Sequence, residues 1–420
     1  MNPRARSILV SLAFFGILFA WIAAKMAYSF TPEFPSLTLL CKWDCGWYES
    51  IARQGYVSPI PPLFQDSEHS NVAFFPAYPL LGRAAALLFG ISFSAALPLV
   101  SILCALLVSI ALARLLANET LGSRLSRFGI LIAYPASFYL FVSYSEALYL
   151  AAMLGGTAIL LARLERGMEH GSGLRTGSLI LAGVALGGTR LTGFIIPGFL
   201  FLAAILLALK TAKLRDRVLT RTAIFVGGAA AGTAAFFAFC AVRFGVWNLY
   251  FWQLAIGWYK EFSPMKAFAL LVNAPFAPSL NFEVLLHESR HLSWMLITTI
   301  LIGSIYAGFR AIFTARHAYR IADRPVFFRC FLVFAAIAHF FIVVCGDAGP
   351  WDHWGNGLRY PMPTVYLLAV AWRDEWTPAF IRERPLIRTL AWTATLVVLA
   401  FLFALQVGYL GRFIRNEWVS

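Results

Sequence analysis

Apolar runs of about 20 residues recur along this chain, and they restrict its fold more than any other feature of the sequence. A helix of that length crosses the hydrocarbon core of a bilayer and satisfies its backbone hydrogen bonds internally. Only 13% of the residues are charged and 60% are hydrophobic, whereas a soluble domain is about one quarter charged. The sequence therefore predicts an all-α polytopic membrane protein, with residues 1–420 forming a single integral-membrane domain.

Hydropathy predicts about eleven transmembrane helices. Several are expected to be short or interrupted, because Pro135, the pair Gly187 and Gly188, and Pro197 fall inside them. Their approximate ranges are 8–28, 91–117, 124–140, 144–164, 177–191, 193–210, 222–243, 291–313, 326–346, 358–372 and 388–408.

The distribution of positive charge predicts a cytoplasmic N-terminus and an extracytoplasmic C-terminus. With this orientation the inner segments are short and hold 22 of the 34 Lys and Arg residues. The net charge of +14 is then explained by topology and by anionic lipid headgroups. A nucleic-acid partner is not expected.

Three outer segments follow from this topology, at about 29–90, 244–290 and 345–359. The first contains a proline-rich loop and then the apolar stretch 76–89, which Arg83 interrupts. This stretch predicts an interfacial helix that lies on the membrane surface.

The six cysteines form no CxxC or CxxH pair, so a zinc site is not indicated. Cys41 and Cys45 share the first outer segment, and Cys345 lies at the outer end of a later span. Both a disulfide among these three and free thiols are compatible with the sequence.

The stretch from Cys41 to Tyr56, CKWDCGWYESIARQGY, follows the first span and places Asp44 between Trp43 and Trp47. An aromatic belt accounts for the tryptophans but not for an acid at the lipid boundary. An acid in an aromatic, partly desolvated surrounding is a candidate general base. The competing interpretation is that Asp44 caps the helix that follows.

Other charged residues are predicted on the same outer side, among them Glu146, Arg190, Lys260 and Arg359. Cations there can hold an anionic lipid phosphate. Tryptophan and tyrosine faces suit the apolar face of a sugar ring. Together with Asp44, these residues suggest transfer of a group from a lipid phosphate to an acceptor hydroxyl.

Several motifs resemble, in the same order, the GPI mannosyltransferase 2 (phosphatidylinositol-glycan class V) family and its bacterial relatives, within the C-type glycosyltransferase (GT-C) superfamily. The resemblance runs along most of the chain. The motifs are Trp43-Asp44, Trp47-Tyr48, Ile51-Ala52, Gly55-Tyr56, Ala73-Phe74-Phe75-Pro76, Tyr78-Pro79, Pro135-Ala136-Ser137, Tyr144-Ser145-Glu146, Arg190 with Gly193, and Arg359-Tyr360.

This resemblance implies an inverting transfer of mannose from a polyprenyl- or dolichyl-phosphate mannose donor, with no cofactor and no metal. Asp44 matches the family's catalytic acid. The partners would be the lipid-linked sugar, a membrane-associated glycan or glycolipid acceptor, and membrane lipids. The chain lacks the long lumenal insertions of eukaryotic members, which favours a bacterial inner (plasma) membrane protein with a periplasmic site. The alternative is an endoplasmic reticulum protein with a lumenal site.

Each candidate also has a structural interpretation. Arg190 and Arg359 either bind the donor phosphate or extend to the membrane interface. Glu146 binds a sugar or an arginine, or caps its span. Glu49 is expected to pair with Arg53 four residues later.

For the later segments, His353 beside Asp352 could ligate a metal, but no third ligand is apparent. His339 is expected to be satisfied inside the bundle. Gln253 and Trp258, with Tyr259, either line the donor groove or belong to an aromatic belt. The predicted site therefore has Asp44 as its catalytic residue and no metal ligand. The predicted phosphate-binding residues are Arg190, Arg359 and Lys260. The predicted substrate-binding residues are Trp43, Trp47, Tyr48, Glu146, Tyr144, Gln253, Trp258 and His353.

Two other functions remain open. A flippase or transporter of lipid-linked sugars would carry charged groups at mid-depth and repeat symmetry, and neither is visible. A C-type transferase for another lipid-linked sugar, such as arabinose, glucose or aminoarabinose, would have the same motif spacing.

Overall fold

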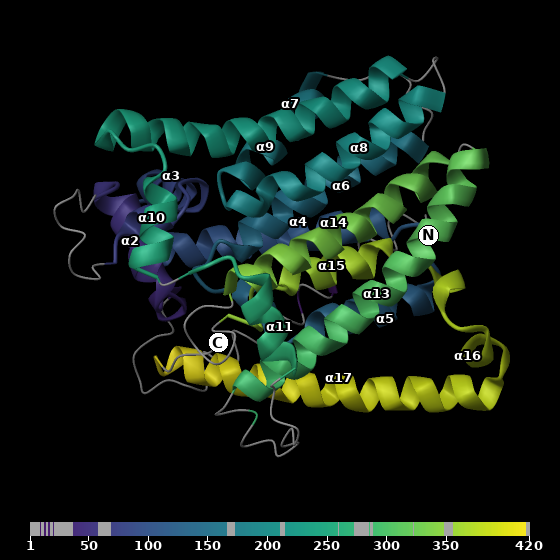
Figure 1. Cartoon of the computed structure of the whole chain (residues 1–420). Helices are drawn as coiled ribbons and strands as arrows, with labels where there is room; N and C mark the ends of the chain where they lie inside the picture. The colour runs from purple at the N-terminus through teal and green to yellow at the C-terminus, as the bar shows by residue number, and fades with distance from the viewer. Residues whose placement is uncertain are drawn as a thin grey trace.

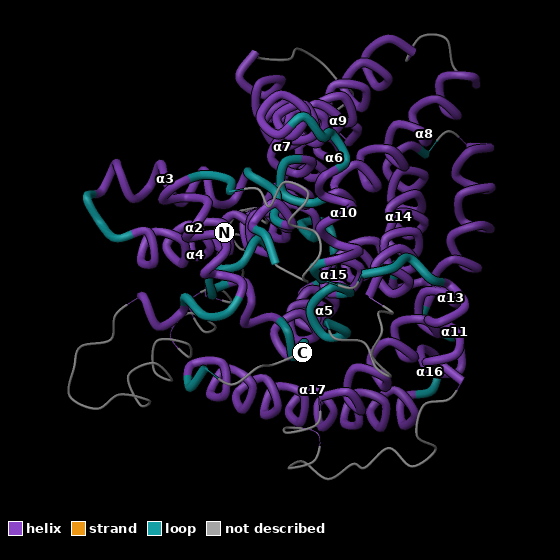
Figure 2. The backbone as a smooth tube through the Cα atoms, turned by 60° about the vertical axis from the view of Figure 1, so that its left-hand side comes forward, coloured by secondary structure: helices purple, strands orange, loops and turns teal. Residues whose placement is uncertain are grey.

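The computed structural model describes residues 37–57, 69–165, 173–210, 215–258, 260–272, 289–321, 323–347 and 356–416, with a few single positions elsewhere. Every regular element in these ranges is a helix (Figure 2). The predicted first span, 8–28, lies outside the continuously described residues.

Within the described ranges six helices are long and apolar enough to cross a membrane, so the protein is a multi-pass membrane protein. They are α4 (Phe93–Leu115), α8 (Ile195–Lys210) with the 3-10 turn η5 (Leu191–Phe194) before it, α9 (Arg215–Phe244), α13 (Ser289–Ile321), α14 (Arg324–Asp347) and α17 (Pro385–Ile414).

Shorter helices complete the bundle and its ends. The apolar ones are α3 (Ala77–Phe89), α6 (Glu146–Glu165), α7 (Gly173–Gly187) and α15 (Met362–Ala371). The others are η1 (Leu37–Leu40), α2 (Asp44–Gln54), η3 (Asn71–Ala73), α5 (Leu121–Ala133), η4 (Ser137–Leu140), α10 (Leu249–Ile256), α11 (Pro264–Val272), η7 (Asp374–Trp376) and α16 (Ala379–Glu383).

Each predicted span after the first contains a helix, but breaker residues shorten two of them as expected. Tyr134 has ψ 123° and ends α5, because the ring of Pro135 disfavours a helical conformation of the residue before it. α7 ends at Gly187. Pro197, in contrast, does not interrupt a helix, because it lies in the first turn of α8, where no amide donor is required.

The predicted interfacial stretch 76–89 is helical and forms α3. The helix ends at Gly90, whose φ of 63° is the left-handed conformation that glycine adopts without strain. The buried Tyr78 hydroxyl donates to the carbonyl of Leu97 at 2.8 Å, which fastens α3 to α4.

Helices α7 and α9 approach each other closely through small residues. A Cβ at Gly187 would lie 1.9 Å from the carbonyl oxygen of Ala229, and one at Gly232 would lie 2.4 Å from that of Val184. Small residues at such spacing let two membrane helices pack backbone to backbone. The close contact therefore fixes the position of α7 relative to α9, and with it the position of the C-terminal end of α7.

The bundle has two distinct ends (Figure 1). The short helices α2, α3 and α10 gather at one end, and α16 lies at the other. We call these the α2 end and the α16 end. Helices α4, α6 and α15 begin at the α2 end, and α7 and α14 finish there, so residues far apart in the sequence meet at this end.

Candidate active site

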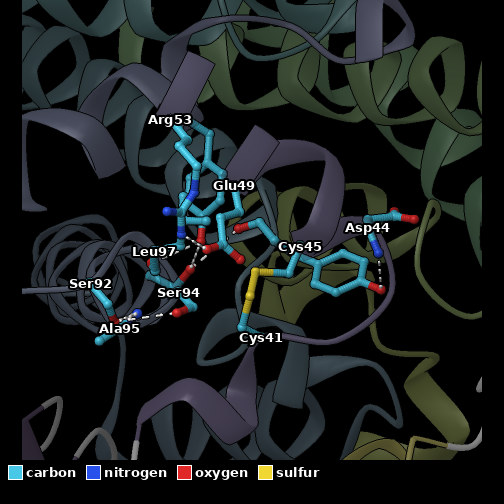
Figure 3. The surroundings of a disulfide bond; sticks show 12 residues. Cys41, Asp44, Cys45, Glu49, Arg53, Ser92, Ser94, Ala95 and Leu97 are labelled. Carbon is cyan, nitrogen blue, oxygen red and sulfur yellow. Dashed lines mark hydrogen bonds and ion pairs between the residues drawn. A yellow bond between two sulfur atoms is a disulfide. The ribbon is translucent and has the colours of Figure 1, made fainter. Parts of the chain in front are cut away.

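Asp44 is the first residue of α2, and its carboxylate points to Arg359. Oδ2 of Asp44 accepts a hydrogen bond from Nη1 of Arg359 at 2.7 Å. The Asp44 amide donates a long hydrogen bond, 3.4 Å, to the hydroxyl of Tyr144 (Figure 3). Helix α2 has no side-chain cap, so the interpretation of Asp44 as a helix cap is wrong. The side chain is 12% exposed, which leaves the carboxylate accessible but mostly desolvated.

The chain enters α2 through an unusual turn at Trp43. The Cys45 amide donates to the carbonyl of Lys42 at 3.1 Å and closes a β-turn. Trp43 has φ 54° and ψ −114°, the dihedral angles of the first central position of a type II′ turn, where glycine is normally found. A bulky residue held in this region costs about 1–3 kcal/mol. Such strain is commonly stored at functional sites, and here it lies directly beside Asp44.

A disulfide joins Cys41 to Cys45 across this turn (Figure 3). The sequence left a disulfide and free thiols open, and the structure resolves the question for all six cysteines. The other four are buried free thiols, and Cys345 is one of them. The sulfur atoms lie beside the start of α2, and the Asp44 carboxylate points away from them.

Glu146, at the start of α6, lies between two arginines. Its side chain is fully buried. Nη2 of Arg190 donates to its Oε1, and Nε of Arg359 forms an ion pair with the same oxygen at 3.2 Å. Oε2 is buried and has no hydrogen-bond partner among the described residues. Oε1 of Glu146 thus pairs with both guanidinium groups, while Oε2 accepts no hydrogen bond from the described residues.

Arg359 is held in place by a turn that Asp347 organises. The Asn356 amide donates to Oδ2 of Asp347 at 2.6 Å. The amides of Arg359 and Tyr360 then donate to the Asn356 carbonyl, each at 3.0 Å. Lys260 pairs with Oδ1 of the same aspartate. Asp347, at the end of α14, therefore holds both Lys260 and the turn that carries Arg359.

The ring of Tyr360 lies among all three cations. The centroid is 5.5 Å from the Arg190 guanidinium, 5.7 Å from the Lys260 ammonium and 4.9 Å from the Arg359 guanidinium. Contacts of this kind stabilise a cation that is partly removed from water. The sequence did not single out Tyr360 or Asp347 for the site, although Tyr360 is part of a matched motif and Asp347 falls in the predicted outer segment 345–359.

The charges of the cluster stabilise one another. Burial alone would lower the pKa of Arg190, but the Glu146 carboxylate reverses this effect and leaves the pKa raised. Burial also opposes the charged form of Arg359, yet the carboxylates of Asp44 and Glu146 raise its pKa well above the usual value. Burial alone would also lower the pKa of Lys260, but the Asp347 carboxylate outweighs this effect and the pKa is raised. All three cations therefore stay charged over the physiological pH range.

Tyr48 and Tyr144 line the cluster with neutral hydroxyl groups. Burial raises the pKa of both phenols, so they act as hydrogen-bonding groups and not as anions. The Tyr48 hydroxyl donates to Oγ of Ser145 at 3.0 Å. The Tyr144 ring lies 4.9 Å from the Arg359 guanidinium.

An aromatic cluster extends from the charged groups toward the surface. Trp47 stacks on Phe74 at 6.0 Å and meets Trp258 edge to face at 5.9 Å. His69 in turn contacts Trp258 at 4.6 Å. Nε1 of Trp258 is buried without a hydrogen-bond partner in the described part of the chain. Trp47 and Trp258, both predicted substrate-binding residues, thus lie together, although Trp47 is in α2 and Trp258 comes just after the end of α10.

Other predicted residues lie apart from this group or cannot be placed. Trp43 is 40% exposed at the rim. Gln253 is buried in α10, and its carbonyl accepts the amides of Gly257 and Trp258. His353 lies outside the described residues, as does Tyr259.

Three acids and three cations form the cluster, so its formal charge is balanced: Asp44, Glu146 and Asp347 face Arg190, Lys260 and Arg359. Among the described residues no group of three His, Cys, Asp or Glu side chains could hold a metal ion.

Comparisons with known proteins give no family assignment. No protein-family model and no curated protein matches the chain. Among solved structures, the crystal structure of ArnT from Cupriavidus metallidurans bound to undecaprenyl phosphate is similar, with a TM-score of 0.49 and 14% sequence identity. The alignment covers 96% of this chain and 77% of that chain.

Proposed function

We propose that the protein is an inverting GT-C glycosyltransferase that moves mannose from a polyprenyl-phosphate mannose donor to a hydroxyl of a membrane-associated glycan or glycolipid. The observation that carries the proposal is Arg359, whose guanidinium joins the carboxylates of Asp44 and Glu146 at one end of a membrane bundle. Arg190 and Lys260 lie beside it. The resemblance of the motifs supports a lipid-phosphate donor, and the resembled family suggests mannose as the sugar.

The three cations would bind the phosphate of the donor. A phosphodiester anion forms charge-assisted hydrogen bonds with guanidinium groups, which present a planar fork of donors. Because each cation is already paired with a carboxylate, the phosphate has to share or replace a carboxylate partner. Arg359 is the cation that we expect to bind the phosphate first. It pairs with two carboxylates, so it can release one of them and keep the other.

Donor binding would therefore free the catalytic base. When Arg359 moves toward the phosphate, the Asp44 carboxylate loses its hydrogen-bond donor and can accept the proton of the acceptor hydroxyl. The acceptor oxygen forms a bond to the anomeric carbon from the face opposite the phosphate. The bond from that carbon to the phosphate oxygen breaks, and its electron pair leaves with the phosphate, whose growing charge the cations stabilise.

The location of the site fits a lipid-borne donor. The cluster lies at the α2 end, and the basic residues assigned to inner segments, such as Arg124, Arg329 and Arg373, lie toward the α16 end. With the charge rule for membrane proteins, this arrangement supports an extracytoplasmic site. In a bacterium the site would face the periplasm.

Product analysis tests this proposal. Purified protein is incubated with polyprenyl-phosphate mannose, glucose, arabinose or aminoarabinose, each with a bacterial membrane extract as acceptor. We expect transfer from the mannose donor, with the opposite anomeric configuration in the product. Transfer of another sugar would keep the GT-C assignment and replace mannose. Absence of any product, together with translocation of a labelled lipid-linked sugar across vesicles, would show a flippase instead.

A further inference from the structure

The Cys41–Cys45 disulfide encloses the residues that lead into α2, including Asp44. Within this ring the Trp43 backbone adopts a positive φ, and the Cys45 amide closes the turn onto Lys42. A side chain with a Cβ rarely adopts this conformation, so the surrounding structure has to hold it. The disulfide is the one covalent constraint in the described structure that spans the turn.

One side of this disulfide is fixed to the loop that leads into Glu146. Leu40, directly before Cys41, is buried, and its carbonyl accepts the Ser143 amide at 3.0 Å. Ser143 lies three residues before Glu146. On the other side, Cys45 is fully buried in the first turn of α2. The bond therefore connects the helix of Asp44 to the segment that leads into Glu146.

The noncovalent contacts of Asp44 are few. Its amide makes only a 3.4 Å hydrogen bond to Tyr144, and its carboxylate shares Arg359 with Glu146. If the turn relaxed to an ordinary negative φ at Trp43, the direction of the Asp44 side chain would change at the same time. Positional errors of about 1 Å in a reacting group can lower a rate by about 100-fold.

We propose that the Cys41–Cys45 disulfide is a positioning element for Asp44, so that reduction of this bond switches off sugar transfer without abolishing donor binding. The proposal rests on the function proposed above. A dithiol such as dithiothreitol converts the disulfide to two thiols and is itself oxidised to a cyclic disulfide. The enzyme would then be active only where disulfides persist, on the extracytoplasmic face.

The experiment compares oxidised and reduced full-length protein. The remaining four cysteines are already thiols, so the reductant acts on this bond alone. Hydrogen exchange of peptides covering 41–48, the kcat for transfer, and the affinity for polyprenyl phosphate are measured in both states. On reduction we expect exchange in 41–48 to become at least about tenfold faster. The kcat should fall about 10- to 100-fold, with an unchanged dissociation constant for polyprenyl phosphate and recovery after reoxidation.

Two variants separate positioning from general stability. Cys41→Ser/Cys45→Ser should behave like reduced protein and no longer respond to the reductant. Trp43→Gly should make transfer less sensitive to reduction, because glycine adopts the positive φ without a covalent constraint. The quantity compared between Trp43→Gly and the parent is the ratio of the kcat of the oxidised protein to the kcat of the reduced protein. Any effect of losing the indole is present in both states and cancels in this ratio.

The outcomes are distinct. Unchanged exchange in 41–48 on reduction would overturn the proposal whatever the activity, as would faster exchange with unchanged kcat. An equal loss of donor affinity and kcat, with Trp43→Gly as sensitive as the parent, would also overturn it, because the bond would then only stabilise the fold. Absence of transfer by oxidised protein would reject the proposed function, and the exchange measurement would still decide whether the disulfide holds this segment.

Discussion

The two ends of the bundle both carry buried arginines that pair with carboxylates, but in the described part of the chain only those at the α16 end also donate to backbone carbonyls. At the α16 end, Arg124 donates to the carbonyls of Ala117 and Glu119, and Arg329 donates to the carbonyl of Leu115. These carbonyls lie at and just beyond the C-terminal end of α4. Cations there satisfy the unpaired carbonyls and interact favourably with the helix dipole. Arg124 and Arg329 are thus explained by the fold, while Arg127 at the same end pairs with the side chains of Glu119 and Asp374.

At the α2 end the hydrogen bonds of the arginines go to side chains. Arg190 donates to Ser145 and Glu146, and Arg359 donates to Asp44 and Tyr360. Among the described residues neither guanidinium donates to a backbone carbonyl. The difference favours the α2 end as the ligand site, because a side-chain partner can be exchanged for an anion without disrupting a helix end.

The largest effect is expected for Asp44→Asn. The amide cannot accept the acceptor proton, so kcat should fall roughly 10²- to 10⁴-fold. Binding of the donor should be retained, since the cations are unchanged. Kinetics and donor titration with purified protein measure both quantities. The matched control is Asp374→Asn at the α16 end, which should leave kcat unchanged. Full activity of a correctly folded Asp44→Asn protein would exclude Asp44 as the base.

Glu146→Gln should weaken the fold but strengthen binding of an anion. Loss of the carboxylate leaves Arg190 and Arg359 without their shared counter-charge, which should lower the free energy of unfolding by roughly 3–5 kcal/mol. The same loss should tighten binding of polyprenyl phosphate, which can now take the place of the carboxylate. A denaturant titration in detergent with and without the lipid checks both. Weaker lipid binding in the variant would contradict the exchange of partners.

Arg329→Met tests the opposite end. Nη1 of Arg329 donates to Glu119 at 3.0 Å, and Nη2 donates to the Leu115 carbonyl at 3.0 Å. Losing these hydrogen bonds should reduce stability by about 1–3 kcal/mol. The kcat of the surviving folded protein should not change. If kcat fell as it does in Asp44→Asn, the distinction between the two ends would be lost.

The smallest effect is expected for Glu49→Gln on the outer face of α2. Glu49 pairs with Arg53 at 2.8 Å, as the sequence spacing predicted, but Arg53 is 61% exposed. An exposed pair at this spacing contributes about 0.3–0.5 kcal/mol. Both thermal stability and kcat should stay close to the parent values. A large loss of kcat would mean that any charge on α2, and not Asp44 in particular, supports the reaction.

Much of the fold could be predicted from the sequence, because the signals are local. Apolar length predicted the helices, and Pro135 and Gly187 predicted where two of them end. The i, i+4 pair of Glu49 and Arg53 also depends only on spacing within one helix. The expected interruption at Pro197 was wrong, since its effect depends on where the helix begins.

The partners within the site could not be predicted in this way. Asp44 and Arg359 are separated by 315 residues, and Lys260 and Asp347 by 87. Residue type and topology placed these groups on one side of the membrane. Which carboxylate faces which cation depends on the packing of α2, α6 and the end of α14.

The sequence by itself determined a bundle of membrane helices and the places where several of them break, and it predicted that Asp44, Glu146, Arg190 and Arg359 lie on the same side of the membrane. Only the tertiary structure decided that Glu146 bridges both arginines and that Cys41 pairs with Cys45. The physical reason is that helix formation and membrane orientation follow from local composition and backbone hydrogen bonding. Pairing across hundreds of residues follows from close helix packing, such as that of α7 on α9, which fixes where each helix end arrives.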